Sequence, residues 1–98
     1  MSDDDVGFAP PPFSADGALI AIKRALRDLK LGERGNAYEL RGKRVVELAI
    51  EGNTVRARLA RRLMQTPEWD RLVVAGASDQ RKLIDEVKKR LARWDNED

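Results

Sequence analysis

The sequence predicts an α+β fold: a two-layer sandwich in which two helices lie on one face of a sheet of three or four antiparallel strands. Residues 14–31 and 78–94 have apolar side chains at helical spacings of three and four. Residues 37–60 instead alternate apolar and polar side chains, as half-buried strands do. Each helix has one apolar stripe and the sheet has one apolar face, so both helices should cover that face.

The chain has 98 residues, which is room for one domain with a modest core. We assign this domain to residues 14–94. Residues 1–13 contain an aspartate run and consecutive prolines, which predict a disordered arm, and residues 95–98 form an acidic tail. No apolar run approaches the roughly 18 residues of a membrane span. The chain has no cysteine, which fits a reducing environment, and we expect a cytoplasmic protein.

Capping residues predict where the helices begin and end. Ser14 is a suitable N-cap, with Asp16 in the first turn, where the helix dipole favours negative charge. Gly32 should end this helix, because glycine tolerates the left-handed conformation of a helix C-terminus. The last helix should have Ser78 as its N-cap and Asp79 in its first turn.

Two hairpins connect the predicted strands. A loop at residues 32–36 should precede the first strand, at 37–41, and that strand should turn at Gly42. Gly52 and Asn53 then suit a two-residue hairpin turn whose first position is left-handed.

The second hairpin has a register that can be tested. A two-residue loop sets Val46 opposite Leu59 on the apolar face and Glu47 opposite Arg58 on the other face. Apolar residues therefore meet apolar residues, and opposite charges meet across the strands. For the first hairpin a three-residue loop is favoured, because it sets Tyr38 opposite Val46.

The segment after the second hairpin is less regular. Residues 66–68 predict one short helical turn, because a threonine N-cap precedes Pro67. Residues 71–75 could form a fourth strand or a buried connection, and five residues are too few to choose between them. Trp69 should cap one edge of the sandwich, whereas Trp94 completes the apolar stripe of the last helix.

The apolar face of the sheet and the apolar stripes of the helices define the predicted core. Strict alternation places Val45 on the opposite, charged face of the sheet. The predicted core residues are Leu19, Ile22, Leu26, Leu29, Tyr38, Leu40, Val46, Leu48, Ile50, Val55, Leu59, Leu83, Ile84, Val87 and Leu91.

The residue types argue against an enzyme. Histidine and cysteine are both missing from the chain, and with them the commonest general base, the thiol nucleophile and the usual zinc ligands. Glu47 and Glu51 share one strand face, but four residues along a strand separate them by roughly 13 Å, beyond the spacing of paired glycosidase carboxylates. The sequence contains no phosphate loop or calcium loop, so we predict no catalytic residue, no metal and no cofactor.

Basic residues dominate the body of the chain. All 19 Lys and Arg lie between Lys23 and Arg93, whereas seven of the 17 acids stand near the two ends. Basic side chains on the open face of the sheet would form an anion-binding platform for phosphate backbones. With the glutamates of the same face they would instead form a solvated, partly neutralised surface, which is the interpretation we prefer. The candidate anion-binding residues are Arg41, Lys43, Arg44, Arg56, Arg58 and Arg62.

The predicted order of helix, three strands and helix resembles that of the double-stranded-RNA-binding domain. This resemblance implies a nucleic-acid partner gripped by lysines at the N-terminus of the second helix. Asp79 and Gln80 stand where those lysines would be. The resemblance therefore covers the order of elements over most of the chain and no specific motif.

Two functions from different classes remain. The sequence favours a small non-enzymatic cytoplasmic domain that acts as a protein-interaction or homo-oligomerising module, using the unpaired edge of its first strand, an uncovered apolar patch or the proline arm. The alternative is a nucleic-acid-associated module that uses the basic sheet face. The two differ in whether the arginines of that face stay unpaired in the folded protein.

Overall fold

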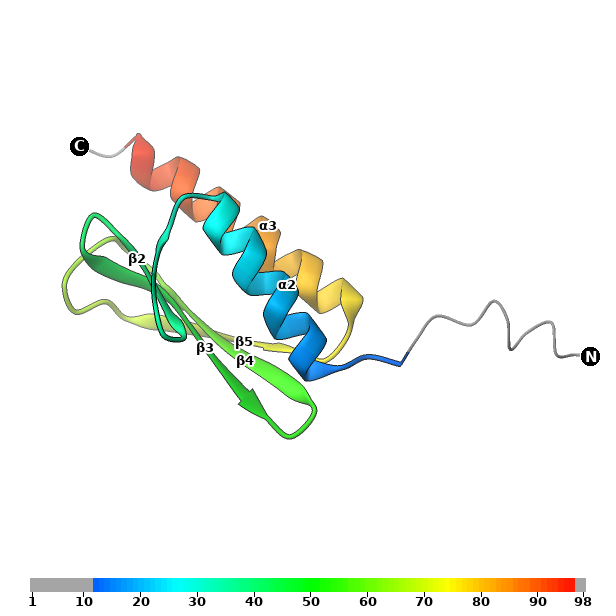
Figure 1. Cartoon of the computed structure of the whole chain (residues 1–98). Coiled ribbons are helices and arrows are strands. Elements are labelled where there is room, and N and C mark those ends of the chain that lie inside the picture. Colours follow the sequence, from blue (N-terminus) through cyan, green and yellow to red (C-terminus); the bar gives the residue numbers. More distant parts are fainter. Residues whose placement is uncertain (1–11, 97–98) are drawn as a thin grey trace, which may run out of the picture.

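The computed structural model describes residues 12–96 and confirms the α+β class (Figure 1). Its antiparallel sheet has five strands in the order β1-β2-β3-β4-β5, whereas three or four were expected. Both helices lie side by side on one side of the sheet in Figure 1. The elements are α2 (Ala15–Asp28), β1 (Gly32–Arg34), β2 (Ala37–Leu40), β3 (Lys43–Glu51), β4 (Thr54–Ala60), β5 (Trp69–Val74) and α3 (Ala77–Asp95).

The register of the β3–β4 hairpin is confirmed. Val46 lies opposite Leu59 and Glu47 opposite Arg58, as the two-residue loop requires. Gly52 adopts a φ of 61°, the left-handed conformation expected at the first turn position. The side chain of Asn53 adds a long-range role to this turn, because its Oδ1 accepts a hydrogen bond of 3.1 Å from the backbone N–H of Ala15 at the start of α2.

The β2–β3 hairpin corrects the predicted three-residue loop. Its turn has two residues, Arg41 and Gly42, with φ values of 55° and 78°. Tyr38 still pairs with Val46, because the register shifts by one residue between Tyr38 and its neighbour. This shift is a β-bulge at Val45, which turns the Val45 side chain to the core, where it is 1% exposed. Alternation alone had placed Val45 on the open face.

The two additional strands lie at the edges of the sheet. β1 occupies the first half of the predicted loop 32–36 and pairs with β2 through a tight turn in which Gly35 has a φ of 60°. A strand of three residues is too short to show alternation, so the sequence pattern could not reveal it. β5 realises the strand alternative for residues 71–75 but begins earlier, at Trp69. Residues 66–68 form no helix and belong to the irregular connection before β5.

The start of α2 is as predicted, but its end is not. Ser14 is the N-cap of α2 and its Oγ accepts a hydrogen bond of 3.2 Å from the Gly17 N–H. The helix ends at Asp28, however, and Gly32 lies in β1. The left-handed residue at the C-terminus is Lys30, with a φ of 70°, and the next N–H, of Leu31, donates to the Leu26 carbonyl. Lys30 therefore takes the position expected for a glycine. The next residue, Leu31, is buried and supplies the apolar contact that accompanies this type of helix end.

The predicted cap of α3 is wrong by two positions. The helix begins at Ala77, so Gly76 is the N-cap and Ser78 lies inside the first turn. Asp79 is in the first turn as expected, and its Oδ2 accepts a hydrogen bond of 3.0 Å from the Ala75 N–H. Gly76 has no side chain to accept a hydrogen bond from the first turn, so the side-chain contact at this helix start is the one from Asp79 to the residue before the cap.

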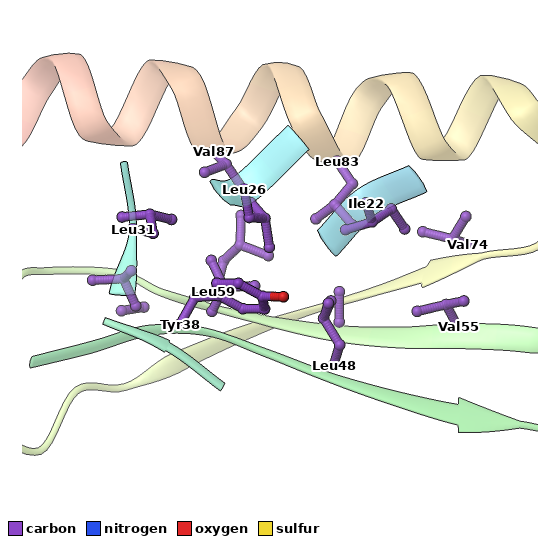
Figure 2. Packing of buried hydrophobic residues seen from close by; sticks show 14 of the residues in the cluster. Ile22, Leu26, Leu31, Tyr38, Leu48, Val55, Leu59, Val74, Leu83 and Val87 are labelled. Atoms are coloured by element: carbon purple, nitrogen blue, oxygen red, sulfur yellow. The ribbon is translucent and has the colours of Figure 1, made fainter. Parts of the chain in front are cut away.

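The core lies between the sheet and the helices (Figure 2). Figure 2 shows Leu83 and Val87 of α3, with Ile22 and Leu26 of α2, directed toward the sheet. Of the predicted core residues, nine are buried, namely Ile22, Leu26, Tyr38, Val46, Leu48, Val55, Leu59, Leu83 and Val87. Leu19, Leu29, Leu40 and Leu91 are partly buried against this cluster, and Trp94 is buried as expected.

Two residues of the predicted core are not in it. Ile50 is 40% exposed, because the end of β3 diverges from the helices, as Figure 2 shows. Ile84 is half-buried and lies outside the core cluster.

The predicted arm and tail fall largely outside the described residues, which begin at residue 12 and end at residue 96. Phe13 lies within them and is partly buried against the core. Its carbonyl accepts a hydrogen bond of 3.2 Å from Asn53 Nδ2. Asp95, assigned to the acidic tail, is the last residue of α3.

Candidate functional site

None of the helices and strands described in residues 12–96 covers the face of the sheet that points away from the helices. Its side chains come from β2, β3, β4 and β5, because residues opposite one another in the antiparallel ladders share a face. The face carries Glu39, Arg44, Glu47, Ala49, Glu51, Arg56, Arg58, Trp69, Arg71 and Val73. We call this set the open face.

Three of the predicted anion-binding residues lie on the open face and are paired there with glutamates. Glu47 forms ion pairs with both Arg44, at 3.2 Å, and Arg58, at 3.1 Å. Arg56 pairs with Glu51 at 3.0 Å. These pairs neutralise much of the charge that a polyanion would need.

The other three predicted residues lie elsewhere. Arg41 is in the β2–β3 turn and pairs at 3.6 Å with Asp95, at the end of α3. Lys43 lies opposite Leu40, which packs against the core, so the bulge in β3 places Lys43 on the helix side of the sheet. Arg62 is in the connection that follows β4. The predicted platform is therefore not one contiguous surface.

Trp69 belongs to β5 and is half-buried on the open face, where it lies opposite Ala60. It begins the edge strand β5 and is partly buried against the core cluster, which agrees with its predicted place at one edge of the sandwich. The guanidinium carbon of Arg58 lies 4.9 Å from the centroid of the Trp69 ring, a cation–π contact. This contact and the ion pair to Glu47 hold Arg58 close to the sheet surface.

A shallow hollow of about 280 Å³ lies over β3, β4 and β5 on this face. Arg56, Arg58 and Arg71 are among its lining residues. Arg58 and Arg71 stand directly opposite one another on β4 and β5. Like charges in opposite positions of an antiparallel pair are mutually destabilising. Positive charge therefore remains unbalanced where β5 forms one side of the hollow.

The sheet has two edges, and they differ in length. β1 has three residues and β5 has six. Strand 37–41 was expected to provide the unpaired edge, but β1 pairs with it, so this expectation is wrong. Short edge strands resist pairing with another chain, whereas longer ones can template it. The edge with the greater capacity for pairing is therefore β5.

The hydrogen-bonding pattern identifies the free backbone groups of β5. The N–H of Arg61 donates to the Glu68 carbonyl over 2.9 Å, which extends the β4–β5 ladder by one pair. Hydrogen-bonded pairs alternate along an antiparallel ladder, so every second residue of β5 directs its N–H and C=O toward β4. The residues whose groups point away from the sheet are therefore Trp69, Arg71 and Val73.

The sequence did not reveal this edge. Residues 69–74 show no strict alternation of apolar and polar side chains, although in the structure Asp70, Leu72 and Val74 face the helices. Arg71 and Val73 are exposed, and Val73 retains 56% of its surface. Sequence could not show that β5 is an outer strand, because that depends on which strands pair.

A groove of about 500 Å³ runs between the β5 edge and α3. Its apolar residue is Leu72, which is partly buried against the core. The polar residues lie on one face of α3 and carry both signs of charge, with bases in excess. They are Lys82, Asp85, Glu86, Lys89 and Arg90.

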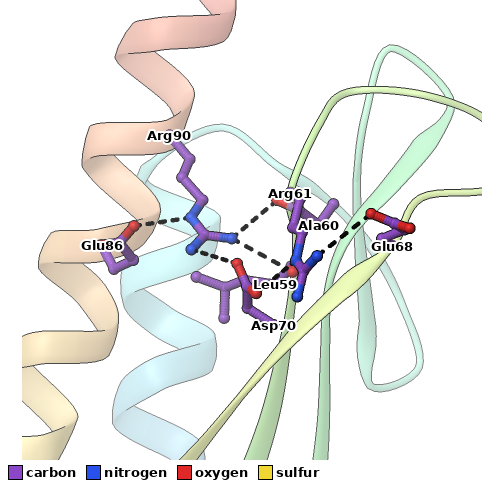
Figure 3. Close-up of polar contacts among 7 residues, drawn as sticks. All are labelled: Leu59, Ala60, Arg61, Glu68, Asp70, Glu86 and Arg90. Atoms are coloured by element: carbon purple, nitrogen blue, oxygen red, sulfur yellow. Dashed lines mark hydrogen bonds and ion pairs between the residues drawn. The ribbon is translucent and has the colours of Figure 1, made fainter.

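Arg90 ties α3 to the β4–β5 end of the sheet (Figure 3). Its side chain is 12% exposed and its Nη2 pairs with Asp70 at 2.9 Å. Nη1 donates to the Ala60 carbonyl over 3.1 Å, and Nε donates to Glu86 over 2.9 Å. All three nitrogens of this guanidinium therefore have an acceptor, as a largely buried charge requires.

Asp70 is shared between two arginines. Its Oδ1 accepts a hydrogen bond of 2.7 Å from Arg61 Nε, and Arg61 also contacts Glu68, as Figure 3 shows. The hydrogen bond from Arg61, assisted by that from Arg90, lowers the pKa of the Asp70 carboxyl below its ordinary value. Asp70 therefore stays ionised and anchors the first half of β5 to both neighbours.

Four further observations bear on function. Within residues 12–96, no group of three or more acidic side chains is arranged to hold a metal ion. Neither of the helices described here is long and apolar enough to cross a membrane.

Compared with known proteins, the chain matches no family model, no curated protein and no solved structure. Its five strands also depart from the three-strand order of the double-stranded-RNA-binding domain.

Proposed function

We propose that this protein is a protein-interaction module that binds an extended segment of a partner by strand addition to β5. The observation that carries this proposal is the outer edge of β5, which no other strand of residues 12–96 covers. Trp69, Arg71 and Val73 direct their backbone groups away from the sheet there. An added strand gains main-chain hydrogen bonds from such an edge, and its alternate side chains gain contacts on either side of it.

The surroundings of β5 favour binding by this edge. Arg90 and Asp70 join the strand to α3, so the edge is held in an ordered position before a partner arrives. Preorganisation of this kind lowers the entropic cost of association. The groove beside α3 provides room for the side chains that an added strand directs toward the helix.

A partner other than a second copy of the chain fits this edge better. If two β5 strands paired antiparallel with full overlap, Arg71 of one copy would lie opposite Arg71 of the other, since it is the middle of the three outward-directed residues. Like charges directly opposite each other oppose such pairing, and a charged residue on an edge is a common device against self-association. The homo-oligomer therefore has less support than a distinct partner.

Nucleic-acid binding by the open face also has less support. The arginines that would contact phosphates are paired with Glu47 and Glu51. A polyanion would have to compete with these carboxylates. We favour a binding role over catalysis because the chain contains no histidine or cysteine. The lack of cysteine also suits a cytoplasmic location.

Proline at position 73 tests the proposal. The Val73 N–H points away from the sheet, so Val73→Pro removes a donor that only an added strand would use, and edge strands tolerate proline at such positions. Val73→Thr is the matched control because it keeps the N–H. Peptides are first selected from a displayed library of random heptapeptides with the wild-type protein.

The selected peptides should shift the backbone amide resonances of Trp69, Arg71 and Val73 in NMR titrations. They should bind Val73→Thr like wild type and lose binding to Val73→Pro. Failure to select any peptide, or binding that Val73→Pro leaves intact, would show that β5 is not the binding edge.

A further inference from the structure

The charge at the centre of the β5 edge has no counterpart in the described part of the chain. Arg71 is exposed, and no ion pair joins it to another of residues 12–96. Its cross-strand neighbour is Arg58. The two form a non-hydrogen-bonded pair, the kind in which opposite side chains approach more closely. An anionic group beside Arg71 would relieve this repulsion.

An added strand would place one side chain at that point. Residues that pair with Trp69, Arg71 and Val73 project on the open face, because opposite residues share a face. A residue opposite Arg71 therefore lies beside the Arg71 guanidinium. A carboxylate there can accept charge-assisted hydrogen bonds, which are stronger than neutral ones.

The next residue of the added strand projects to the other face. If it lies opposite Leu72, it enters the groove between β5 and α3. Leu72 is the apolar residue of that groove, and the long side chains of Lys82 and Lys89 lie along it. Their alkyl stems and Leu72 together suit an apolar side chain, and their ammonium groups disfavour a basic one.

We infer that the segment bound by β5 carries an acidic residue opposite Arg71, flanked by an apolar residue that enters the groove beside Leu72. This inference rests on the proposed strand addition and defines the chemistry of the partner. The same arginine that opposes self-pairing thereby selects an acidic segment, so specificity contains both a repulsive and an attractive element.

Three synthetic peptides test the inference. Each has the sequence Thr-Val-X-Val-Thr with blocked termini, where X is Glu, Gln or Lys, and each is titrated into the protein with NMR detection of backbone amides. The Glu peptide should bind about tenfold more tightly than the Lys peptide, with the Gln peptide between them. The resonances that shift should include the amides of Trp69, Arg71 and Val73.

Two variants provide the controls. Arg71→Glu should reverse the order, so that the Lys peptide binds most tightly. Arg24→Glu changes the net charge equally, but Arg24 is exposed on α2 and does not line the hollow beside Arg71, so the original order should remain. Equal affinity of the three peptides at β5 would overturn the acidic preference and leave strand addition standing. No binding by any peptide up to millimolar concentrations would overturn both.

Discussion

The hydroxyl of Tyr38, whose ring is fully buried, donates a hydrogen bond of 2.9 Å to the carboxylate of Glu33 on the neighbouring strand. Glu33 also forms an ion pair with Arg27 of α2, at 3.3 Å. A strand absent from the predicted fold, β1, is thus joined through one carboxylate to both the core and the first helix. The Tyr38–Glu33 contact has a measurable consequence for ionisation.

Burial, and then the hydrogen bond to Glu33, raise the pKa of Tyr38 to about 12 from an ordinary value of 10.0. A raised pKa stabilises the fold below the unfolded pKa, and this stabilisation is lost as the pH rises from 10.0 toward about 12. Tyr38 is the single tyrosine of the chain, so ultraviolet absorbance of tyrosinate reports on it alone. Glu33→Gln should lower the Tyr38 pKa only in part, because burial remains. Titration of Tyr38 near pH 10 in a folded sample would contradict this environment.

The left-handed conformation of Lys30 predicts a stabilising substitution. Lys30→Gly should raise the free energy of unfolding by about 0.5–1 kcal/mol, because glycine adopts this conformation without the steric cost of a side chain. Arg24→Gly is the control: it places glycine at an exposed position inside α2 and should destabilise by about 1 kcal/mol. Urea denaturation of both variants measures the difference. A loss of stability in Lys30→Gly would argue against the observed helix end.

The Asp70 carboxylate predicts a local dependence on pH. Asp70→Asn should lower the free energy of unfolding at neutral pH by about 1 kcal/mol, because the largely buried Arg90 loses a charged partner. The pKa of Asp70 is depressed, so its contribution is present above the ordinary value of 3.8 and is lost as the pH falls below it. The stability difference between wild type and Asp70→Asn should therefore shrink in acid. Glu68→Gln, at an exposed partner of Arg61, should have little effect at any pH.

The Arg71 edge predicts a gain of self-association. Arg71→Val replaces the like-charge pair of a β5–β5 contact with two β-branched apolar residues, which favour strand pairing. Sedimentation equilibrium should then show concentration-dependent dimers that wild type does not form under the same conditions. Arg56→Val, which adds the same residue to an interior strand, should remain like wild type. Dimers of equal stability in both variants would assign the contact to the open face instead of the edge.

Sequence reasoning succeeded where neighbouring residues alone decide the structure. The Gly52-Asn53 turn and the period of two on either side of it allow one pairing that keeps apolar residues together, and the structure contains that pairing. The start of α2 is equally local, since Ser14 and the N–H of Gly17 are three residues apart. The bulge at Val45 and the exposure of Ile50 were missed, because both depend on where the helices meet the sheet.

The candidate sites divide in the same way. The sequence by itself determined that basic side chains line the outer positions of β4 and that Glu47 lies opposite Arg58, because alternation and register are properties of consecutive residues. Only the tertiary structure decided that Arg41 turns to the end of α3 and that Lys43 lies on the helix side of the sheet. It also decided that β5 is the open edge. An edge exists because a strand has no neighbour, and that is a property of the whole sheet, which no local pattern of residues contains.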